Sequence, residues 1–286
     1  MKIVTDSGSD LSMEQCQVLG VTMLPLKVQL GGKTYLSGVD LSPEEFYDLI
    51  EHTDEMPTTS TPSVGDFVEV YKRLGKEDAD ILSIHLSSGL SGTYSAAVTA
   101  SKLVKQNVTL VDTLTLSAGT GWQVEAAAQA AKANLPLNVI LEKLKQIQAA
   151  TNVFFTLPDL KYLIAGGRIS HLKGLLASLL GITPIITVNK QDGKYYDKSK
   201  KRSYQKAIQA IPELILENHP EGTELRAQIC HAANLEGGNL LKQAMESVFK
   251  CEWLPDCSIG TALGAHTGRG LVGIMHAAKA DYPSIP

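Results

Sequence analysis

The sequence predicts an α/β protein of two domains, with a largely parallel sheet in the N-terminal domain and a smaller α/β C-terminal domain. Its 286 residues are enough for two domains. Apolar residues make up 44% and charged residues 20%, which is ordinary for a globular protein. In the first half, short apolar runs alternate with amphipathic stretches, a pattern typical of parallel strands joined by helices.

In the first half, the strands are expected at 2–6, 21–30, 80–86 and 107–112, and the helices at 12–20, 42–51, 63–75, 93–104, 117–133 and 136–150. Pro25 lies inside the second strand and makes it an edge or irregular strand. Ser42 with Glu45, and Ser63 with Asp66, have the spacing of helix-capping pairs.

In the second half, a strand is expected at 152–157 and a helical stretch over 160–181, broken at Gly166 and Gly167. Residues 182–197 read as a hairpin that turns at Asp192–Gly193. A helix from about Ser203, strands at 225–232 and 270–278, and a helix at 237–249 follow. We therefore place one domain at 1–155 and the other at 156–286.

Composition and charge exclude several classes of protein. The net charge is −4 and no long basic run occurs, which argues against nucleic acid as a partner. The four cysteines form no C-x-x-C pair, so buried thiols in a reducing compartment are expected. The N-terminus has no apolar signal-peptide core, and no apolar run is long enough to span a membrane. We expect a cytoplasmic protein without an integral membrane segment.

Three stretches are rich in glycine or hydroxyl residues: 57–63, 87–93 and 264–270. The first two end where a helix is predicted to begin, so free N–H groups and the helix dipole favour an anion there. Ser and Thr also serve simply as helix caps, so each loop alone is weak support for a site. In the third stretch, glycines two residues to either side of His266 would let its ring approach a ligand closely.

Familiar catalytic motifs are absent from these stretches. "SSGLSGT" lacks the lysine of a phosphate-binding loop, and Thr93 replaces the second glycine of a nucleophile elbow. The turn after the first strand reads "DSGSDLS" rather than a dinucleotide-binding fingerprint. The histidines show no metal-ligand spacing, so we expect no metal and no cofactor.

Together the motifs resemble those of the DegV family of bacterial fatty-acid-binding proteins. "VTDSGSDLS", "TSTPS" at 59–63, "SSGLSGTYSAA", "AGGRIS" at 165–170 and "GAHTGRG" occur in that order over nearly the whole chain. The resemblance implies a DegV-like two-domain fold with a long-chain fatty acid, such as palmitate (C16–C18), in an apolar tunnel between or within the domains. It implies no enzyme activity: the family includes binding subunits that present the carboxylate to a separate fatty acid kinase, and lipid transport is the other role.

By motif, the resemblance assigns the fatty-acid carboxylate to Thr59 or Ser60, Ser91 and His266. Secondary contacts with ligand or partner would come from the residues Gly92, Thr93, Arg168 and Arg202. Apolar residues of 172–188 and 152–157 are candidates for the tunnel wall, although any core needs such residues.

One departure from the family pattern stands after the histidine, where Arg269 replaces the usual proline and places a cation near the proposed carboxylate end. Two other functions remain open. A hydrolase or phosphotransferase would use Ser91 and His266, with Asp6 or Asp112 orienting the histidine. A regulatory interaction protein would carry the lipid incidentally. A monomer is the expected oligomeric state.

Overall fold

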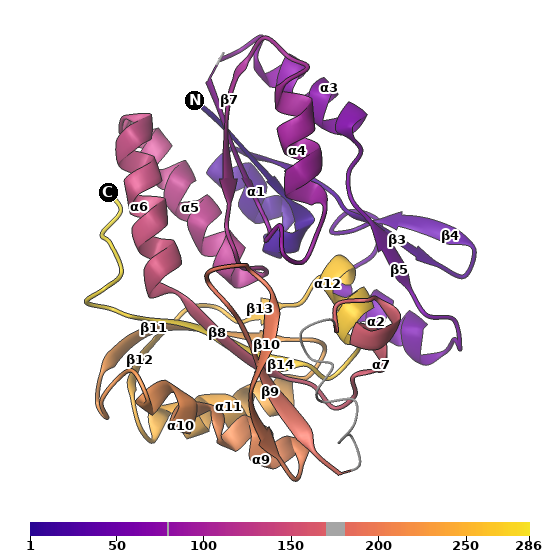
Figure 1. The fold of residues 1–286 in the computed structure, drawn as a ribbon, viewed down its shortest axis with the longest axis vertical. Helices are drawn as coiled ribbons and strands as arrows, with labels where there is room; N and C mark the ends of the chain where they lie inside the picture. Colours follow the sequence, from indigo (N-terminus) through magenta and orange to yellow (C-terminus); the bar gives the residue numbers. More distant parts are fainter. Residues whose placement is uncertain (79, 170–180) are drawn as a thin grey trace.

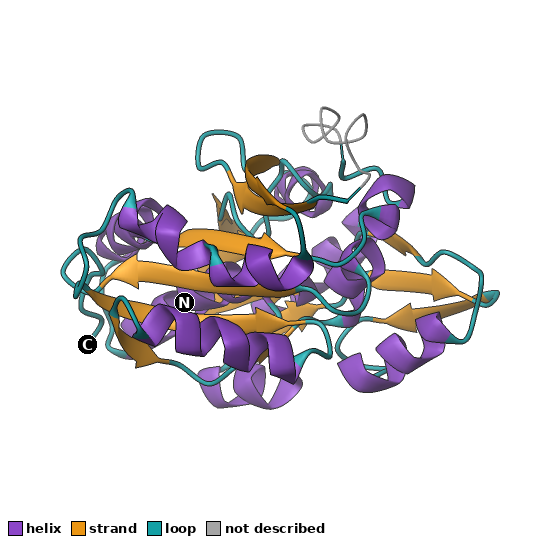
Figure 2. Cartoon of the chain, turned by 90° about the horizontal axis from the view of Figure 1, so that it is seen from below, coloured by secondary structure: helices purple, strands orange, loops and turns teal. Residues whose placement is uncertain are grey.

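The computed structural model describes residues 1–78, 80–169 and 181–286, which form three sheets and the helices around them (Figure 1). The first half contains a parallel sheet and a small antiparallel sheet, and the second half contains a larger mixed sheet. Figure 2 shows helices on the outside of these sheets. This arrangement confirms the α/β class and the parallel N-terminal sheet predicted from the sequence.

The N-terminal sheet has the strand order β2-β1-β6-β7, with all neighbours parallel. Its strands are β1 (Lys2–Asp6), β2 (Val21–Leu24), β6 (Asp80–His85) and β7 (Asn107–Asp112). Ile3 packs toward the helices α1 (Met13–Leu19), α5 (Ala118–Lys132) and α6 (Leu137–Ala150). Its neighbour Val4 packs on the other face, toward α3 (Val64–Leu74) and α4 (Thr93–Ser101). Helices on both faces bury the strands, which explains their nearly continuous apolar runs.

Pro25 divides the strand predicted over 21–30. The chain leaves β2 before Pro25 and enters a second sheet with β3 (Lys27–Leu30), because proline cannot donate a ladder hydrogen bond. In that sheet β3 pairs antiparallel with β4 (Lys33–Leu36) and with β5 (Thr58–Ser60). Strand β5 is unexpected from the sequence, and it fixes part of the polar stretch 57–63 in an extended conformation.

The predicted helix caps are confirmed. Ser42 begins α2 (Pro43–Glu51) and Ser63 begins α3, and each forms a reciprocal capping box with the residue three positions later. A cap of this kind contributes about 1 kcal/mol to stability. The second cap also sets where the stretch 57–63 ends.

The C-terminal sheet has the order β10-β9-β8-β14-β11-β12, with β13 beside β11. Its strands are β8 (Asn152–Thr156), β9 (Thr183–Val188), β10 (Tyr195–Lys201), β11 (Glu224–His231), β12 (Lys250–Trp253), β13 (Cys257–Ser258) and β14 (Val272–Ala278). The helices α9 (Tyr204–Gln209), α10 (Ile211–Leu216) and α11 (Leu235–Glu246) cover one face, toward which Phe154 points. Phe155 points to the opposite face, toward the N-terminal half.

The antiparallel pair β9–β10 confirms the predicted hairpin, with Gly193 at φ +64° in its turn. Of the helical stretch predicted over 160–181, the structure describes α7 (Lys161–Ala165), and residues 170–180 lie outside the described residues. The boundary proposed after residue 155 falls within β8, so the chain changes sheets a few residues earlier, near Thr151.

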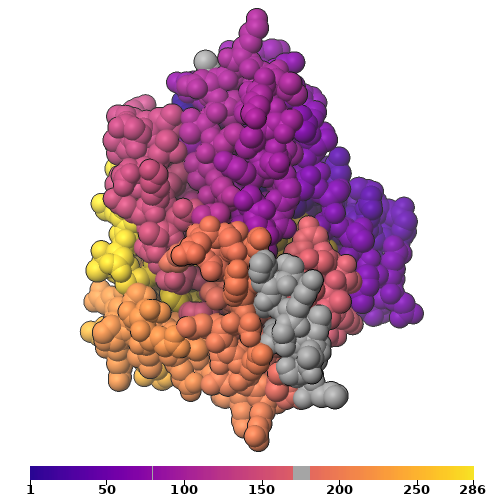
Figure 3. Space-filling view, in the orientation of Figure 1, coloured from indigo at the N-terminus to yellow at the C-terminus, as the bar shows by residue number. Residues whose placement is uncertain are grey.

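The two halves are in close contact (Figure 3). At this junction Trp122 Nε1 donates a hydrogen bond to Gln228 Oε1 at 2.6 Å, and Ser87 Oγ donates to the carbonyl of Gly193 at 2.8 Å. One apolar cluster includes residues of α2, α5, β8, β14 and the short helix α12 (Thr261–Thr267). The halves therefore share a core, and α12 lies within it.

Candidate functional site

Strand β5 presents Thr59 to the C-terminal half. The Thr59 hydroxyl oxygen lies 2.7 Å from His266 Nε2. Ser60 is exposed, and as the next residue on the strand it points to the opposite face. Of the two hydroxyls predicted for this segment, Thr59 is therefore the one beside the histidine.

The loop between β6 and α4 places Ser91, Gly92 and Thr93 at the start of that helix. Ser91 Oγ accepts the Thr93 N–H at 3.2 Å and lies 2.9 Å from Thr93 Oγ1. Gly92 is the N-cap residue and has no side chain to cap with, and Ser91 is the side chain among the described residues that accepts an N–H at the positive end of α4. A Cβ on Gly92 would lie 3.8 Å from Thr61 Cγ2, so the two polar stretches are adjacent.

His266 lies in the last turn of α12, so the first half of the glycine-rich stretch 264–270 is helical. The helix ends at Gly268, whose φ of +69° suits glycine. Gly264 allows α12 to pack against α2, since a Cβ there would lie 2.6 Å from the hydroxyl of buried Tyr47. The glycines thus serve helix packing and termination.

Burial, with a smaller contribution from the charge of Arg168, lowers the pKa of His266 to about 4. The ring is therefore neutral at pH 7 and carries one N–H. Its Nδ1 is buried without a hydrogen-bond partner among the described residues. Because a bare acceptor is less costly to bury than a donor, the hydrogen belongs on Nε2, which then donates to Thr59. The Thr59 O–H is left free to donate to a ligand.

Arg168 connects the β6–α4 loop to the end of α7. Its Nε donates to the carbonyl of Leu90 at 3.2 Å, and its guanidinium also donates to the carbonyl of Gly166. Gly166 lies directly against His266, because a Cβ there would be 2.1 Å from the ring Nδ1. Arg168 is thus close to the histidine.

The two other arginines are placed differently. Arg202 is exposed just after β10, and among the described residues no hydrogen bond or ion pair joins it to the cluster around His266. Arg269 pairs with Asp48 Oδ1 at 2.9 Å and with Glu51 Oε2 at 2.7 Å, both on α2. Two carboxylates therefore balance the charge of Arg269, the residue that departs from the family pattern.

The carboxylates considered for a hydrolase lie elsewhere. Asp6 Oδ2 is 2.8 Å from Nδ1 of His85, inside the N-terminal half. Asp112 accepts backbone N–H groups of nearby loops. Within the described part of the chain neither orients His266, so the acid–base–nucleophile set that this alternative requires is not assembled.

An apolar cavity of about 30 Å³ lies beside α12. Leu263 and Thr267 line it four residues apart in α12, so they share one face of the helix next to His266, and Ile259, just before the helix, lines it as well. Val153 and Phe155 of the predicted strand 152–157 also line it, whereas residues 172–180 of the other predicted tunnel segment lie outside the described residues. The remaining lining residues are Leu116, Ser117, Tyr195, Cys230, Leu271, Gly273, Ile274 and Met275.

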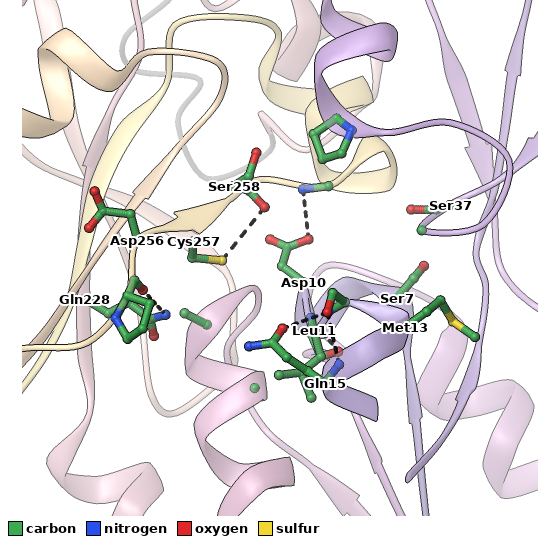
Figure 4. A pocket seen from close by; sticks show the side chains of 18 of the residues that line it. Ser7, Asp10, Leu11, Met13, Gln15, Ser37, Gln228, Asp256, Cys257 and Ser258 are labelled. Carbon is green, nitrogen blue, oxygen red and sulfur yellow. Dashed lines mark hydrogen bonds between the residues drawn. The ribbon is translucent and has the colours of Figure 1, made fainter. Parts of the chain in front are cut away.

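A larger cavity of about 640 Å³ lies between the halves, just before the start of α12 (Figure 4). Asp10 Oδ1 accepts the Gly260 N–H there at 3.0 Å, and burial raises the pKa of Asp10 to about 7. Sequence reasoning missed this cavity. The sequence feature that could have indicated it is Asp10, in the turn after β1, because acidic side chains in turns commonly accept hydrogen bonds from backbone N–H groups.

A family model described as "Uncharacterised protein, DegV family" matches residues 1–279. The chain belongs to the DegV family. A DegV domain-containing protein of Staphylococcus aureus is 36% identical over 274 residues, covering 96% of this chain and 97% of the relative. One from Halalkalibacterium halodurans is 34% identical over 278 residues, covering 95% and 96%.

Solved DegV structures have the same fold. A fatty-acid-binding DegV family protein from Thermus thermophilus superposes with a TM-score of 0.88 at 30% identity, covering 97% of this chain and 99% of that chain. DegV, a fatty acid binding protein from Bacillus subtilis, gives 0.86 at 30% identity with the same coverage.

The described residues of this DegV protein contain no helix that is both long and apolar enough to cross a bilayer. Within the same residues, no three His, Cys, Asp or Glu side chains gather as metal ligands would.

Proposed function

We propose that this DegV protein binds a long-chain fatty acid, of the C16–C18 class, and presents its carboxylate to a partner kinase that forms an acyl phosphate, or carries it between sites. The observation that supports this most is the position of the Thr59–His266 pair beside an apolar cavity along α12. Similar structures from Thermus thermophilus and Bacillus subtilis are fatty-acid-binding proteins. The protein itself performs no chemistry in this proposal.

The polar groups satisfy the carboxylate. Thr59 donates its O–H, oriented by His266, and Ser91 and Thr93 add hydroxyls at the positive end of α4. Hydrogen bonds to a carboxylate are about twice as strong as neutral ones. Arg168 adds positive charge nearby, since it already affects His266. Burial of the carboxylate without such partners would be prohibitive.

The acyl chain supplies most of the affinity. Transfer of about 16 methylene-sized groups at about 0.8 kcal/mol each gives on the order of 10 kcal/mol before opposing costs. The apolar cavity of about 30 Å³ equals roughly one water molecule's share of the liquid. Side chains along α12 must therefore move apart as the chain enters, which offsets part of the gain.

The placement of the polar groups near the surface supports presentation of the carboxylate to a kinase. Thr59, Ser91 and His266 are each partly exposed, so the bound carboxylate would remain within reach of a partner. The sequence lacks a phosphate-binding loop, which leaves ATP to the partner. Exposed Arg202 and half-buried Arg168 are candidates for docking that partner, and we propose that the binding protein itself is monomeric.

Thr59→Val tests the carboxylate site, because it removes the hydroxyl and keeps the shape. We expect about tenfold weaker binding of palmitate, from the loss of one charge-assisted hydrogen bond. Binding of palmityl alcohol should hardly change. The matched control is Ser60→Ala on the same strand, which should leave both ligands unaffected. Equal losses for palmitate and the alcohol would contradict the proposal.

The absence of chemistry is tested with the protein alone. Incubation with palmitate, ATP and Mg²⁺, or with acyl esters, should give no product. Turnover that Ser91→Ala abolishes would instead support a hydrolase or phosphotransferase.

A further inference from the structure

A single layer of residues separates the apolar cavity from the larger interdomain cavity. Ser117 lines the apolar cavity, and the next residue, Ala118, lines the larger one. Likewise, Ile259 lines the apolar cavity and the next residue, Gly260, lines the larger one. The two cavities therefore meet at the point where α5 and α12 both begin.

Two cysteines complete this layer. Cys230 of β11 and Cys257 of β13 are register partners on adjacent parallel strands. Cys230 lines the apolar cavity, whereas Cys257 faces the larger one, as Figure 4 shows. Cys257 Sγ lies 3.8 Å from Ser117 Oγ. We call Ser117, Cys230, Cys257 and Ile259 the wall; three of its four side chains are small.

The wall lies opposite the carboxylate site. Ile259 stands two residues before the first residue of α12, whereas His266 and Thr267 are the last two residues of the helix. Ile259, Leu263 and Thr267 line the apolar cavity in that order. An acyl chain whose carboxylate lies at Thr59 and whose methylenes follow α12 therefore runs toward the wall.

The cavity beyond the wall suits a methyl end of a fatty acid better than its carboxylate. Among its described lining residues are the acids Asp10, Glu125 and Asp256 and no Lys, Arg or His. These acids disfavour a carboxylate, whereas Leu11, Trp122 and Leu254 give a methyl group apolar surface to contact. The wall thus separates an apolar compartment from a mixed one that contains acids.

We propose that the wall sets the longest acyl chain that the protein accepts, with Ile259 as the specificity-determining residue. This inference rests on the proposed fatty-acid binding. Ile259 is the largest of the four side chains and is 4% exposed, so its truncation would join the two cavities. Chains longer than C18 would then extend past Cys257.

The experiment measures competitive binding of arachidate (C20) against palmitate (C16). For Ile259→Ala we expect the C20:C16 preference to rise by about tenfold, the size of a one- or two-methylene effect in an apolar pocket. Adding Ala118→Leu, which places a side chain on the far side of the wall, should reverse the gain. Ile215→Ala, a buried isoleucine on the opposite face of the C-terminal sheet, should leave the preference unchanged.

Ile259→Val provides a milder variant if the alanine protein does not fold, and a smaller rise in the same direction is expected. If the wild type binds palmitate and neither Ile259 variant alters the preference, the wall inference is overturned while the proposed function stands. If the wild type binds no fatty acid of any length, both are overturned.

Discussion

Thr59 and His266 are 207 positions apart in sequence, yet their side chains form one hydrogen-bonded unit. The unit depends on a neutral imidazole. A protonated ring would carry a hydrogen on Nδ1, which is buried and has no acceptor among the described residues. Burial itself maintains this state by lowering the pKa of His266. At the residue scale, the proposed site is therefore a hydroxyl aimed by a histidine rather than a charged pair.

The pH dependence of stability tests the neutral histidine. Its pKa falls from 6.5 in the unfolded chain to about 4 in the folded protein, so the unfolded state binds more protons between these values. The free energy of unfolding should therefore drop as the pH falls from 6.5 toward 4, by up to about 3 kcal/mol from this group.

Urea unfolding at pH 7, 5.5 and 4 measures this drop. Burial also lowers the pKa of His276, to about 3, so part of the drop remains in any His266 variant. His266→Gln should make the dependence shallower. An unchanged slope in His266→Gln would contradict the assignment.

Ser91→Ala distinguishes the orientation of the carboxylate from the affinity for palmitate. The variant keeps the apolar cavity, so palmitate affinity should fall only a fewfold, while the carboxylate loses its hydroxyl at α4. We expect a shifted ¹³C signal from carboxyl-labelled palmitate and a larger loss in acyl phosphate formation by the partner kinase than in affinity. Equal losses in affinity and phosphorylation would count against this role.

At the scale of elements, the close approach of α7 to α12 makes Gly166 critical. A Cβ at this position would lie 2.1 Å from His266 Nδ1, so Gly166→Ala must displace the ring from Thr59. We expect palmitate binding to weaken by about tenfold or more, close to the loss from Thr59→Val. Isothermal titration measures it.

Gly65→Ala is the matched control, because its Cβ meets only Ser63 Oγ at an ordinary 3.5 Å within helix α3. It should bind palmitate normally and gain up to about 1 kcal/mol of stability. Normal binding by Gly166→Ala would show that the helices can separate freely.

The elements that local chemistry determines are the ones that the sequence predicts. Ser42 and Ser63 cap helices through contacts with the residue three positions later, and Gly193 lies in a short hairpin turn. Strand β5 and helix α12 could not be predicted in this way, since β5 is only three residues long and pairs with a strand about 30 positions earlier. Helix α12 has seven residues, too few for a periodic apolar pattern.

At the scale of the molecule, the two halves share one apolar cluster and several hydrogen bonds. Calorimetry should therefore show a single unfolding transition in spite of the two sheets. Palmitate at 100 times its dissociation constant should raise the free energy of unfolding by about 2.7 kcal/mol. Two separate transitions, only one of them shifted by palmitate, would contradict a shared core.

The candidate site shows where prediction from sequence stops. The motifs that carry Thr59, Ser91, Arg168 and His266 were identified from their order, and the fold brings them together. The motifs did not show that Ser60 and Arg202 lie away from His266. Nor did they show that Arg269 pairs with two acids on α2. The cavities depend on packing between halves, which no local pattern encodes.

The central claim is that a fatty acid occupies the protein, and mass spectrometry of organic extracts from purified protein tests it most directly. We predict one equivalent of a C16–C18 fatty acid, reduced in Thr59→Val. A clean extract from protein that also takes up no added palmitate or oleate would contradict the claim.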